Sequence, residues 1–433
     1  MITEKQGCRI CSTKFSGKIL LDLGEQAIVD FIHQDDPSRG RAPLQLVQCK
    51  GCGLVQLRHT VDADTLYRKY WYRSSVNPQM REALRDIVES VMDMVRWEHS
   101  DVFCDIGSND GELLLNYPND VLKIGFEPSK ELAFEASSRL MERRDTHFEI
   151  VNGYFNAIEA LAYVREKKYK IVTAIAMFYD LDDPITFLMD VQSILAPDGV
   201  FVVQMNYLGT MIRNLAFDNI GHEHLCYYSL TTLKKLLDVA GLEVFDLELN
   251  AVNGGSIRTY IAHKGARLIA SSVPELLMME QASLTKEALQ HFADRVETAS
   301  KVLLGFLKEL KKAGKKVYAY GASTRGLTLL QTIFKEEKAT DYIIAAAERD
   351  ERKYSRKMAG VDIPIVSEQA VREADYMLVL PYHFWQSIQR REVSWMKQGG
   401  KFILPLPYPK VVVLETRGLI SHDLEEELDF LKV

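Results

Sequence analysis

The stretch from Val102 to Leu114 constrains the fold of this chain more than any other. It begins with the apolar run Val-Phe-Cys-Asp-Ile, continues through the turn Gly-Ser-Asn-Asp-Gly and ends in an apolar-periodic segment. One strand further on, residues 124–128 read Ile-Gly-Phe-Glu-Pro and place an acid, Glu127, at the strand end. A glycine turn between a strand and a helix, with an acid after the next strand, is typical of α/β domains that bind a ligand at their strand ends. We therefore predict such a domain here, with a helix directly after the turn.

The residues of the turn indicate which ligand this domain binds. The turn lacks the third glycine of GxGxxG and does not match GxxxxGK[ST], so a dinucleotide and ATP are both disfavoured. Its acidic and polar side chains suit S-adenosylmethionine (SAM), which carries a sulfonium and an amino acid group, and Glu127 is placed to bond the ribose hydroxyls. A plain strand–turn–helix corner is the alternative. The predicted SAM contacts are Asp105, Gly107, Asn109, Asp110, Glu127 and Phe178.

Four of the six cysteines form two CxxC pairs near the N-terminus. Each pair places two thiolates on one tight turn, and two such turns complete a tetrahedral site for zinc. No ligand position is left for water, so we predict a structural Zn2+ rather than a catalytic one. A redox pair is the alternative. The predicted ligands, in a small zinc-ribbon-like N-terminal domain, are Cys8, Cys11, Cys49 and Cys52.

Length and composition set the broad class of the protein. A chain of 433 residues suggests two to four domains, and 47% hydrophobic with 26% charged residues is ordinary for a globular protein. The net charge of −7 disfavours a general nucleic-acid binder. No apolar run approaches the roughly 20 residues that span a bilayer, and the N-terminal residues lack a signal core. We expect a cytoplasmic monomer or homodimer without a membrane or nucleic-acid partner.

Alternating strand and helix patterns surround the glycine turn. Strands are expected near 101–106, 122–127, 148–151, 170–176 and 199–205. The loop at 176–184 follows the fourth strand and should line the cofactor, although its aspartates also suit the start of a helix. The aromatic segment 66–75 is either a packed linker or a lid whose Tyr72 and Ser74 reach the site.

The densest polar cluster of the chain lies at 218–230 and contains His222-Glu223-His224. It lacks the i, i+4 spacing of an HExxH zinc helix. A histidine beside a carboxylate suits general-base catalysis, because histidine titrates near neutrality and a carboxylate can hold its tautomer. Structural histidines are the alternative. The predicted catalytic residues are His224, Glu223, His222 and Tyr72.

A second α/β pattern fills the C-terminal part of the chain. The strand at 316–320 leads into Gly-Ala-Ser-Thr-Arg-Gly at 321–326, and a glycine-serine turn before an apolar helix suits a phosphate. The turn at 253–258, Asn-Gly-Gly-Ser-Ile-Arg, either cradles an anion or is a simple hairpin. A long amphipathic helix near 284–313 connects the two α/β parts.

Together these motifs resemble the sugar C-methyltransferase family of deoxysugar biosynthesis, over nearly the full length of the chain. The motifs on which the resemblance rests are the CxxC pairs, Asp-Ile-Gly-Ser-Asn-Asp-Gly, His-Glu-His-Leu, Gly-Gly-Ser-Ile-Arg, Gly-Ala-Ser-Thr-Arg-Gly, Leu-Pro-Tyr-His-Phe and Gly-Gly-Lys-Phe-Ile-Leu-Pro. The resemblance implies a SAM-dependent methyltransferase that methylates the carbon next to the ketone of a nucleotide-linked 4-keto-6-deoxy sugar through an enolate. It implies a zinc-binding domain (1–70), a methyltransferase domain (71–265), a helical connector (266–313) and a C-terminal Rossmann-like domain (314–433) that binds the nucleotide diphosphate sugar.

The resemblance also implies roles for single residues. His224 matches the general base with Glu223 as its neighbour, and Tyr72 matches a lid tyrosine near the sugar. The implied substrate contacts are Asn206, Arg258, Ser323, Thr324, Arg325, Glu348, Arg349 and His383. Gly221 replaces a tyrosine that many members carry before His-Glu-His, Arg325 replaces a lysine, and the loop at 178–183 differs from the usual form. These departures leave the sugar and the methylated carbon open, and an O- or N-methyltransferase of the same architecture is the alternative.

Overall fold

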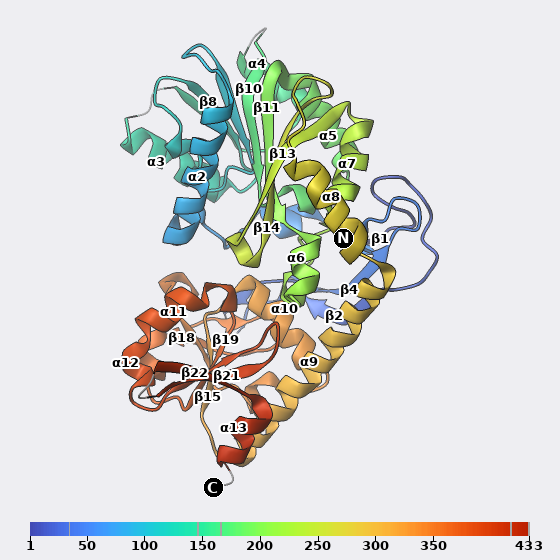
Figure 1. The fold of residues 1–433 in the computed structure, drawn as a ribbon. Coiled ribbons are helices and arrows are strands. Elements are labelled where there is room, and N and C mark those ends of the chain that lie inside the picture. The colour runs from blue at the N-terminus through green and yellow to red at the C-terminus, as the bar shows by residue number, and fades with distance from the viewer. Residues whose placement is uncertain (34, 145–146, 165–166, 416–417, 432–433) are drawn as a thin grey trace.

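The computed structural model describes residues 1–33, 35–144, 147–164, 167–415 and 418–431. Figure 1 shows the sheet of the middle part above that of the C-terminal part, with the N-terminal strands beside their junction. The long helix α9 (Lys286–Lys312) runs along the same side and connects the two larger parts. The α/β class expected from the sequence is confirmed, with two Rossmann-like sheets and a cysteine-rich N-terminal part.

Strand pairing ties the small N-terminal part to both larger parts. Its main sheet has the order β12-β5-β4-β2, and β12 (Cys226–Tyr227) comes from far along the chain, with Cys226 opposite Gln56. A second strand pair joins β3 to β17 (Lys357–Met358) of the C-terminal part. The elements of this part are β1 (Ile2–Glu4), β2 (Leu21–Ala27), β3 (Phe31–Ile32), β4 (Arg41–Gln48), β5 (Val55–Leu57), β6 (His59–Val61) and α1 (Ala63–Tyr67).

The middle part is a sheet of order β13-β14-β11-β10-β7-β8-β9 with helices on both faces. The strands from β11 to β9 in that order are parallel, and β14 and β13 run antiparallel at one edge. The strands are β7 (Val102–Ile106), β8 (Leu122–Phe126), β9 (Phe148–Val151), β10 (Tyr169–Ile175), β11 (Leu195–Asn206), β13 (Leu242–Asn250) and β14 (Ser256–His263). The helices are α2 (Pro78–Met94), α3 (Lys130–Glu142), α4 (Ala157–Val164), α5 (Pro184–Ile194), α6 (Leu208–Arg213), α7 (Leu230–Val239) and α8 (Ser272–Ser283).

The prediction of a helix directly after the glycine turn is wrong. Only the short 3-10 helix η2 (Leu114–Asn116) lies between β7 and β8. Asn109 and Gly111 both have positive φ, at 51° and 77°, so the turn extends further along the chain than a single glycine corner. Pro118 then stops any helix soon afterwards, because its ring is incompatible with a continuing helix. Leu113 and Leu114 of this segment are buried without forming an α-helix.

The C-terminal part repeats the architecture with the sheet order β18-β16-β15-β19-β20-β21-β22. Its strands are parallel from β18 to β20, and β21 and β22 form an antiparallel edge. The strands are β15 (Val317–Tyr320), β16 (Ala346–Glu348), β18 (Ile365–Ser367), β19 (Tyr376–Val379), β20 (Lys401–Leu404), β21 (Lys410–Glu415) and β22 (Gly418–Asp423). The helices are α10 (Thr324–Ile333), α11 (Trp385–Arg391), α12 (Val393–Met396) and α13 (Leu424–Leu431).

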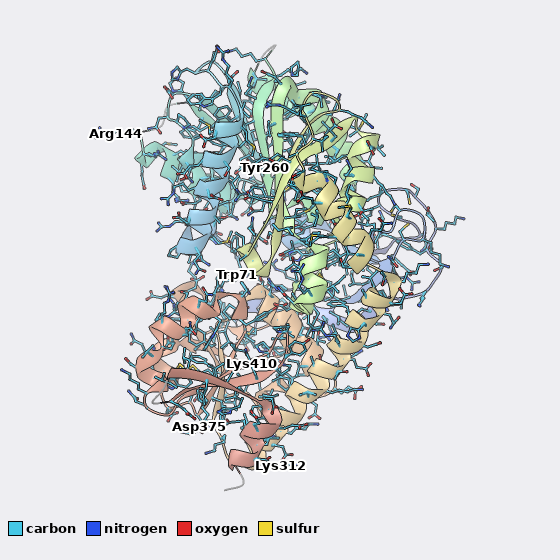
Figure 2. All side chains as sticks on the ribbon, viewed as in Figure 1. Trp71, Arg144, Tyr260, Lys312, Asp375 and Lys410 are labelled. Carbon is cyan, nitrogen blue, oxygen red and sulfur yellow. The ribbon has the colours of Figure 1, made fainter. Side chains whose placement is uncertain are left out.

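One contiguous cluster of buried apolar side chains runs through all three parts. It includes Leu46 of the N-terminal sheet, Phe201 of the middle sheet, Leu307 of α9 and Ile403 of the C-terminal sheet. Figure 2 shows side chains filling the space between the parts, with Trp71 at the junction. Burial of apolar surface therefore stabilises the three parts as one body. None of the helices in the described ranges has both the length and the apolar character needed to cross a membrane.

Candidate active site

A cavity of about 700 Å³ lies where the three parts meet. Its walls combine Tyr67 of the N-terminal part with Gly107, Glu127 and His224 of the middle part. The C-terminal part closes it with the turn at 323–325. A pocket of this volume, lined mostly by apolar and aromatic side chains with a few convergent polar groups, is typical of a small-molecule site.

The turn after β7 forms one end of the cavity, and Glu127 holds it in place. The Glu127 carboxylate accepts an N–H from Asn109 at 2.9 Å on one oxygen and an N–H from Ser129 at 2.8 Å on the other. Asp105 accepts a 2.6 Å bond from the hydroxyl of Thr173. Burial raises the pKa of Asp105 and of Glu127 to about 7. Each Glu127 oxygen keeps a lone pair for a ligand hydroxyl, and Gly107, at φ 74°, lets the backbone approach the ligand. These residues fit an adenosine cofactor.

The side chains of Asn109 and Asp110, which we predicted as cofactor contacts, both bind the segment at 72–76, and of the two only Asn109 also lines the cavity. Asn109 accepts an N–H from Ser74 at 3.0 Å and donates to the carbonyl of Tyr72 at 3.2 Å. Asp110 accepts an N–H from Ser75 at 3.0 Å and is not among the residues that line the cavity. Tyr72 and Ser74 both line it. The aromatic segment therefore docks on the turn and forms part of the cavity wall, as the lid interpretation expected.

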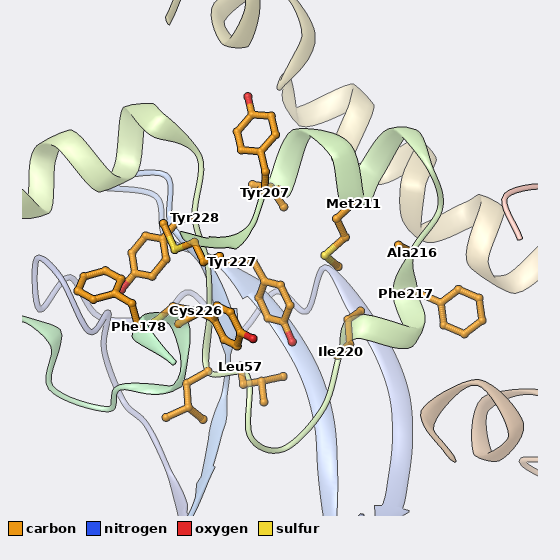
Figure 3. Packing of buried hydrophobic residues seen from close by; sticks show 14 of the residues in the cluster. Leu57, Phe178, Tyr207, Met211, Ala216, Phe217, Ile220, Cys226, Tyr227 and Tyr228 are labelled. Carbon is orange, nitrogen blue, oxygen red and sulfur yellow. The ribbon is translucent and has the colours of Figure 1, made fainter. Parts of the chain in front are cut away.

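Phe178 does not reach the cavity, because it packs in the core. Its ring centroid lies 5.8 Å from that of Phe187 and 5.3 Å from that of Tyr228, and Figure 3 shows it beside Tyr228. Its neighbours in the same loop, Met177 and Tyr179, line the cavity. The prediction that the loop at 176–184 borders the site agrees with this placement, but the short helix η3 (Phe178–Asp180) directs Phe178 inward.

His224 lies in the cavity wall with one fixed tautomer. Its Nδ1 is 2.6 Å from the carbonyl oxygen of Asn219, and since a carbonyl only accepts, Nδ1 carries the proton. The ring of Tyr179 packs edge-on against it, with centroids 4.6 Å apart. Burial lowers the pKa of His224 to about 4. The imidazole is therefore neutral near pH 7, with the lone pair of Nε2 available as a base.

Glu223 and Asp180 form an acidic wall next to His224. Tyr70 donates to the Glu223 carboxylate at 3.4 Å, and the Tyr67 hydroxyl donates to the Glu223 carbonyl at 3.2 Å. Burial raises the pKa of Glu223 to about 7, and burial followed by the charge of Glu223 raises the pKa of Asp180 well above its ordinary value. A Cβ added at Gly221 would meet no atom within 4 Å, so the cavity wall has open space at this residue.

His222, predicted as catalytic, has a structural contact. Its Nε2 donates to the carbonyl of Ala42 at 2.9 Å, and the side chain is buried. Burial lowers its pKa to about 4. This bond attaches the loop before β12 to strand β4 of the N-terminal sheet, so His222 orients the loop that carries His224.

The residues predicted to bind substrate divide into two groups. Those that line the cavity are Asn206, Ser323, Thr324, Arg325 and His383. Arg258, Glu348 and Arg349 are not brought to it. Arg258 is fully buried between Gln204, Asp86 and Glu248, at 2.8, 2.7 and 2.6 Å. Glu348 accepts the N–H of Ala322 at 3.0 Å, and Arg349 is exposed.

Other residues that line the cavity were not named as site residues by the sequence analysis. They are Tyr67, Tyr70, Tyr179, Asp180, Asp218 and Asn219. Tyr179 and Asp180 lie in a loop that was expected at the site, so the strand-end rule was the signal for them. Asp218 and Asn219 were inside the polar cluster before His224, but nothing local distinguishes a residue that supports a base from one in a solvated loop.

The four cysteines of the CxxC pairs converge. Their Sγ atoms all lie within 4.8 Å of one another, with Cys8 to Cys52 at 3.5 Å and Cys11 to Cys49 at 3.4 Å. Sulfurs on a tetrahedral zinc with bonds of about 2.3 Å lie roughly 3.8 Å apart, so the set fits Zn2+. Four thiolates fill the coordination shell, which makes the predicted site structural.

Comparisons with known proteins agree with this arrangement. Residues 8–67 match a family model of a zinc binding domain, residues 76–247 a methyltransferase domain, and residues 251–407 a C-methyltransferase C-terminal domain. The C-methyltransferase NovU of Streptomyces niveus is 29% identical over 429 residues, which cover 94% of this chain and 97% of NovU.

Two solved structures resemble part of the chain. A SAM-dependent methyltransferase from Clostridium acetobutylicum aligns at 13% identity over 43% of this chain and 92% of its own, with a TM-score of 0.33. The magnesium protoporphyrin IX methyltransferase of Synechocystis PCC 6803 aligns at 12% identity over 42% of this chain and 79% of its own, also with a TM-score of 0.33.

Replacing one zinc ligand tests the metal site. Cys8→Ser removes a thiolate, so we expect loss of bound zinc, measured by atomic emission, and a lower melting temperature. Cys104→Ser is the matched control, because Cys104 is a buried cysteine of β7 outside the tetrad and its variant should keep zinc. A zinc-free Cys8→Ser protein with the melting temperature of the parent would contradict a structural metal.

Binding of 5′-methylthioadenosine across pH tests Glu127. This ligand carries the ribose but no amino acid group. If ribose hydroxyls bind the ionised carboxylate, whose pKa is about 7, affinity rises between pH 6 and pH 8 by about tenfold. Glu127→Gln should bind more weakly, by about 1–3 kcal/mol, without that pH trend.

Asp105→Asn is the control for this titration. Asp105 also has a pKa of about 7, so the pH trend should persist in this variant if Glu127 is the group that titrates. Calorimetry supplies the affinities. A flat profile in the parent, or a slope that survives in Glu127→Gln, assigns the ribose to another group.

Proposed function

We propose that this SAM-dependent methyltransferase, in which regions matching a zinc-binding domain, a methyltransferase domain and a C-methyltransferase C-terminal domain follow one another, methylates a carbon of a nucleotide-linked 4-keto-6-deoxy sugar. The methyl group goes to the carbon next to the ketone. One observation carries the proposal, namely that the His224 imidazole, with Nδ1 bound to a carbonyl oxygen, lies in the wall of a cavity bordered by both glycine turns. Domain boundaries near residues 70, 265 and 313 belong to the same proposal.

His224 is the base in this proposal. A ketone acidifies the C–H beside it, and removal of that proton by Nε2 leaves the electron pair as an enolate. The bond from Nδ1 to the Asn219 carbonyl supports this role, since it keeps the proton away from Nε2 and stabilises the imidazolium that forms. Because burial lowers the pKa of His224 to about 4, the basic form persists down to about pH 5.

Carbon methylation then requires alignment and exclusion of water. SAM supplies an electrophilic methyl group, whose bond to sulfur breaks as the carbon–carbon bond forms. The chain contributes the alignment, because Gly107, Glu127 and His224 border one cavity. Tyr179 packs against His224 and, like Phe187, closes the cavity wall, which limits protonation of the enolate by water.

The turn at 323–326 supports a nucleotide diphosphate as the part of the substrate that the C-terminal part binds. Ser323 caps α10 by accepting the N–H of Gly326 at 3.0 Å, and Thr324 opens the helix. Both residues line the cavity. The N-terminus of a helix offers free N–H groups and a positive dipole end to an anion.

Proton exchange at the substrate carbon tests the mechanism. In heavy water without SAM, the parent protein should exchange the proton next to the ketone of a nucleotide-linked 4-keto-6-deoxy sugar, as followed by NMR. His224→Ala should lose exchange and lower turnover by about 10²- to 10⁴-fold while SAM binding is retained. His99→Ala, which changes an exposed histidine away from the cavity, should behave like the parent.

The same experiment separates oxygen or nitrogen methylation from carbon methylation. Methyl transfer without prior exchange would remove the enolate and favour deprotonation of a hydroxyl or an amine. Full exchange in His224→Ala would assign the base to another residue.

A further inference from the structure

Arg325 makes an ion pair across the junction between the C-terminal and middle parts. It is the second residue of α10, and its guanidinium meets Asp218 at two points, with Nε to Oδ2 and Nη2 to Oδ1 both at 2.9 Å. The Asp218 side chain is 0% exposed and that of Arg325 is 13% exposed. A two-point contact between a planar guanidinium and a carboxylate fixes both direction and distance.

A third nitrogen of Arg325 is also engaged within the protein. Nη1 donates to the carbonyl of Asn253 at 2.6 Å, and the Tyr382 hydroxyl donates to the same Asp218 carboxylate at 2.9 Å. A diphosphate would have to compete with these partners for the guanidinium. The side chain is therefore arranged as a clamp between the parts and not as a free anion ligand.

The clamp connects directly to the candidate base. Asp218 is the middle residue of the short helix η4 (Phe217–Asn219), and the next residue, Asn219, accepts the Nδ1 proton of His224 on its carbonyl. Asn219 is held from its other side, because its side-chain oxygen accepts a 2.8 Å bond from Asn206. Phe217, the first residue of η4, and Ile220, which directly follows η4, are labelled in Figure 3 and are 1% and 0% exposed. A helix this short and this tightly packed moves as a unit.

We propose that Arg325 and Asp218 are positioning residues for His224. Through Asn219, the C-terminal part sets the tautomer and the orientation of an imidazole that belongs to the middle part. The proposal rests on the proposed function in that His224 is the base, and it predicts an effect on turnover instead of on substrate affinity.

Arg325→Lys is the decisive variant, because lysine keeps the charge and loses the two-point geometry. We expect kcat to fall by about 10- to 100-fold with little change in KM for the nucleotide sugar. Asp218→Asn, which keeps the shape and removes the charge, should give the same pattern. A raised KM with unchanged kcat would instead make Arg325 a diphosphate ligand and overturn the proposal. Arg356→Lys is the matched control, because Arg356 contacts the carbonyl of Phe31 across another junction.

A readout on the histidine itself is independent of the substrate. In the full-length protein with ¹⁵N-labelled histidine, the parent should show His224 with a protonated Nδ1 and an unprotonated Nε2, assigned by its absence in His224→Gln. Arg325→Lys and Asp218→Asn should shift this signal toward a mixture of tautomers. An unchanged signal in both variants overturns the proposal. If the parent turns over no nucleotide sugar, the proposed function fails while the tautomer measurement still decides the role of the clamp.

Discussion

A strand of two residues determines where the candidate base can lie. Cys226 and Tyr227 form β12 and pair with β5, which extends from the second cysteine pair of the N-terminal part. The bond from His222 to Ala42 attaches the preceding loop to the same sheet. His224 thus lies between two residues that contact the N-terminal sheet, His222 and Cys226. The end of this sheet that carries the cysteines fits a metal ion. Integrity of the zinc site is in this way a condition for the geometry of a residue far along the sequence.

The two Rossmann-like parts share one local contact, which has a different role in each. In each, an acid at the end of the second strand accepts an N–H from the preceding glycine turn, Glu127 from Asn109 at 2.9 Å and Glu348 from Ala322 at 3.0 Å. Glu127 also borders the cavity, whereas Glu348 does not and is paired with Lys353 at 3.3 Å. The motif by itself thus explains how the turn is stabilised. Whether the acid also faces a ligand depends on which neighbouring part covers the strand end.

Local patterns sufficed for much of the fold. The strands β7 to β11 and the helix α9 fall close to their expected ranges because hydrophobic periodicity is a property of neighbouring residues. The cysteine tetrad was equally accessible, since spacing alone defines a CxxC turn. The cavity-lining places of Gly107 and Glu127 follow from strand-end rules, whereas His224 was indicated by the polar cluster around it.

Long-range partners account for what the sequence could not reveal. An arginine after a glycine turn looks the same whether it meets a phosphate or a carboxylate. Arg258 is occupied by Asp86, which lies far away in the chain, and by Glu248 of the neighbouring strand, and Arg325 is occupied by the distant Asp218. In the same way, Asp110 faces the backbone of Ser75 instead of a ligand. No single-sequence pattern reports such pairings, because they are set by how segments distant in the chain pack within and between the three parts.

Burial also reverses the usual order of acid and base within the site. In water a glutamate loses its proton well before a histidine does. Here burial lowers the pKa of His224 to about 4 and raises that of Glu223 to about 7, and burial together with the charge of Glu223 raises the pKa of Asp180 well above its ordinary value. Two carboxyls in one poorly solvated wall do not both ionise readily. Near neutral pH the wall thus holds a neutral imidazole next to a Glu223 carboxyl that is about half protonated. Groups whose pKa values are pushed apart in this way can act as a base and a proton donor within one cavity.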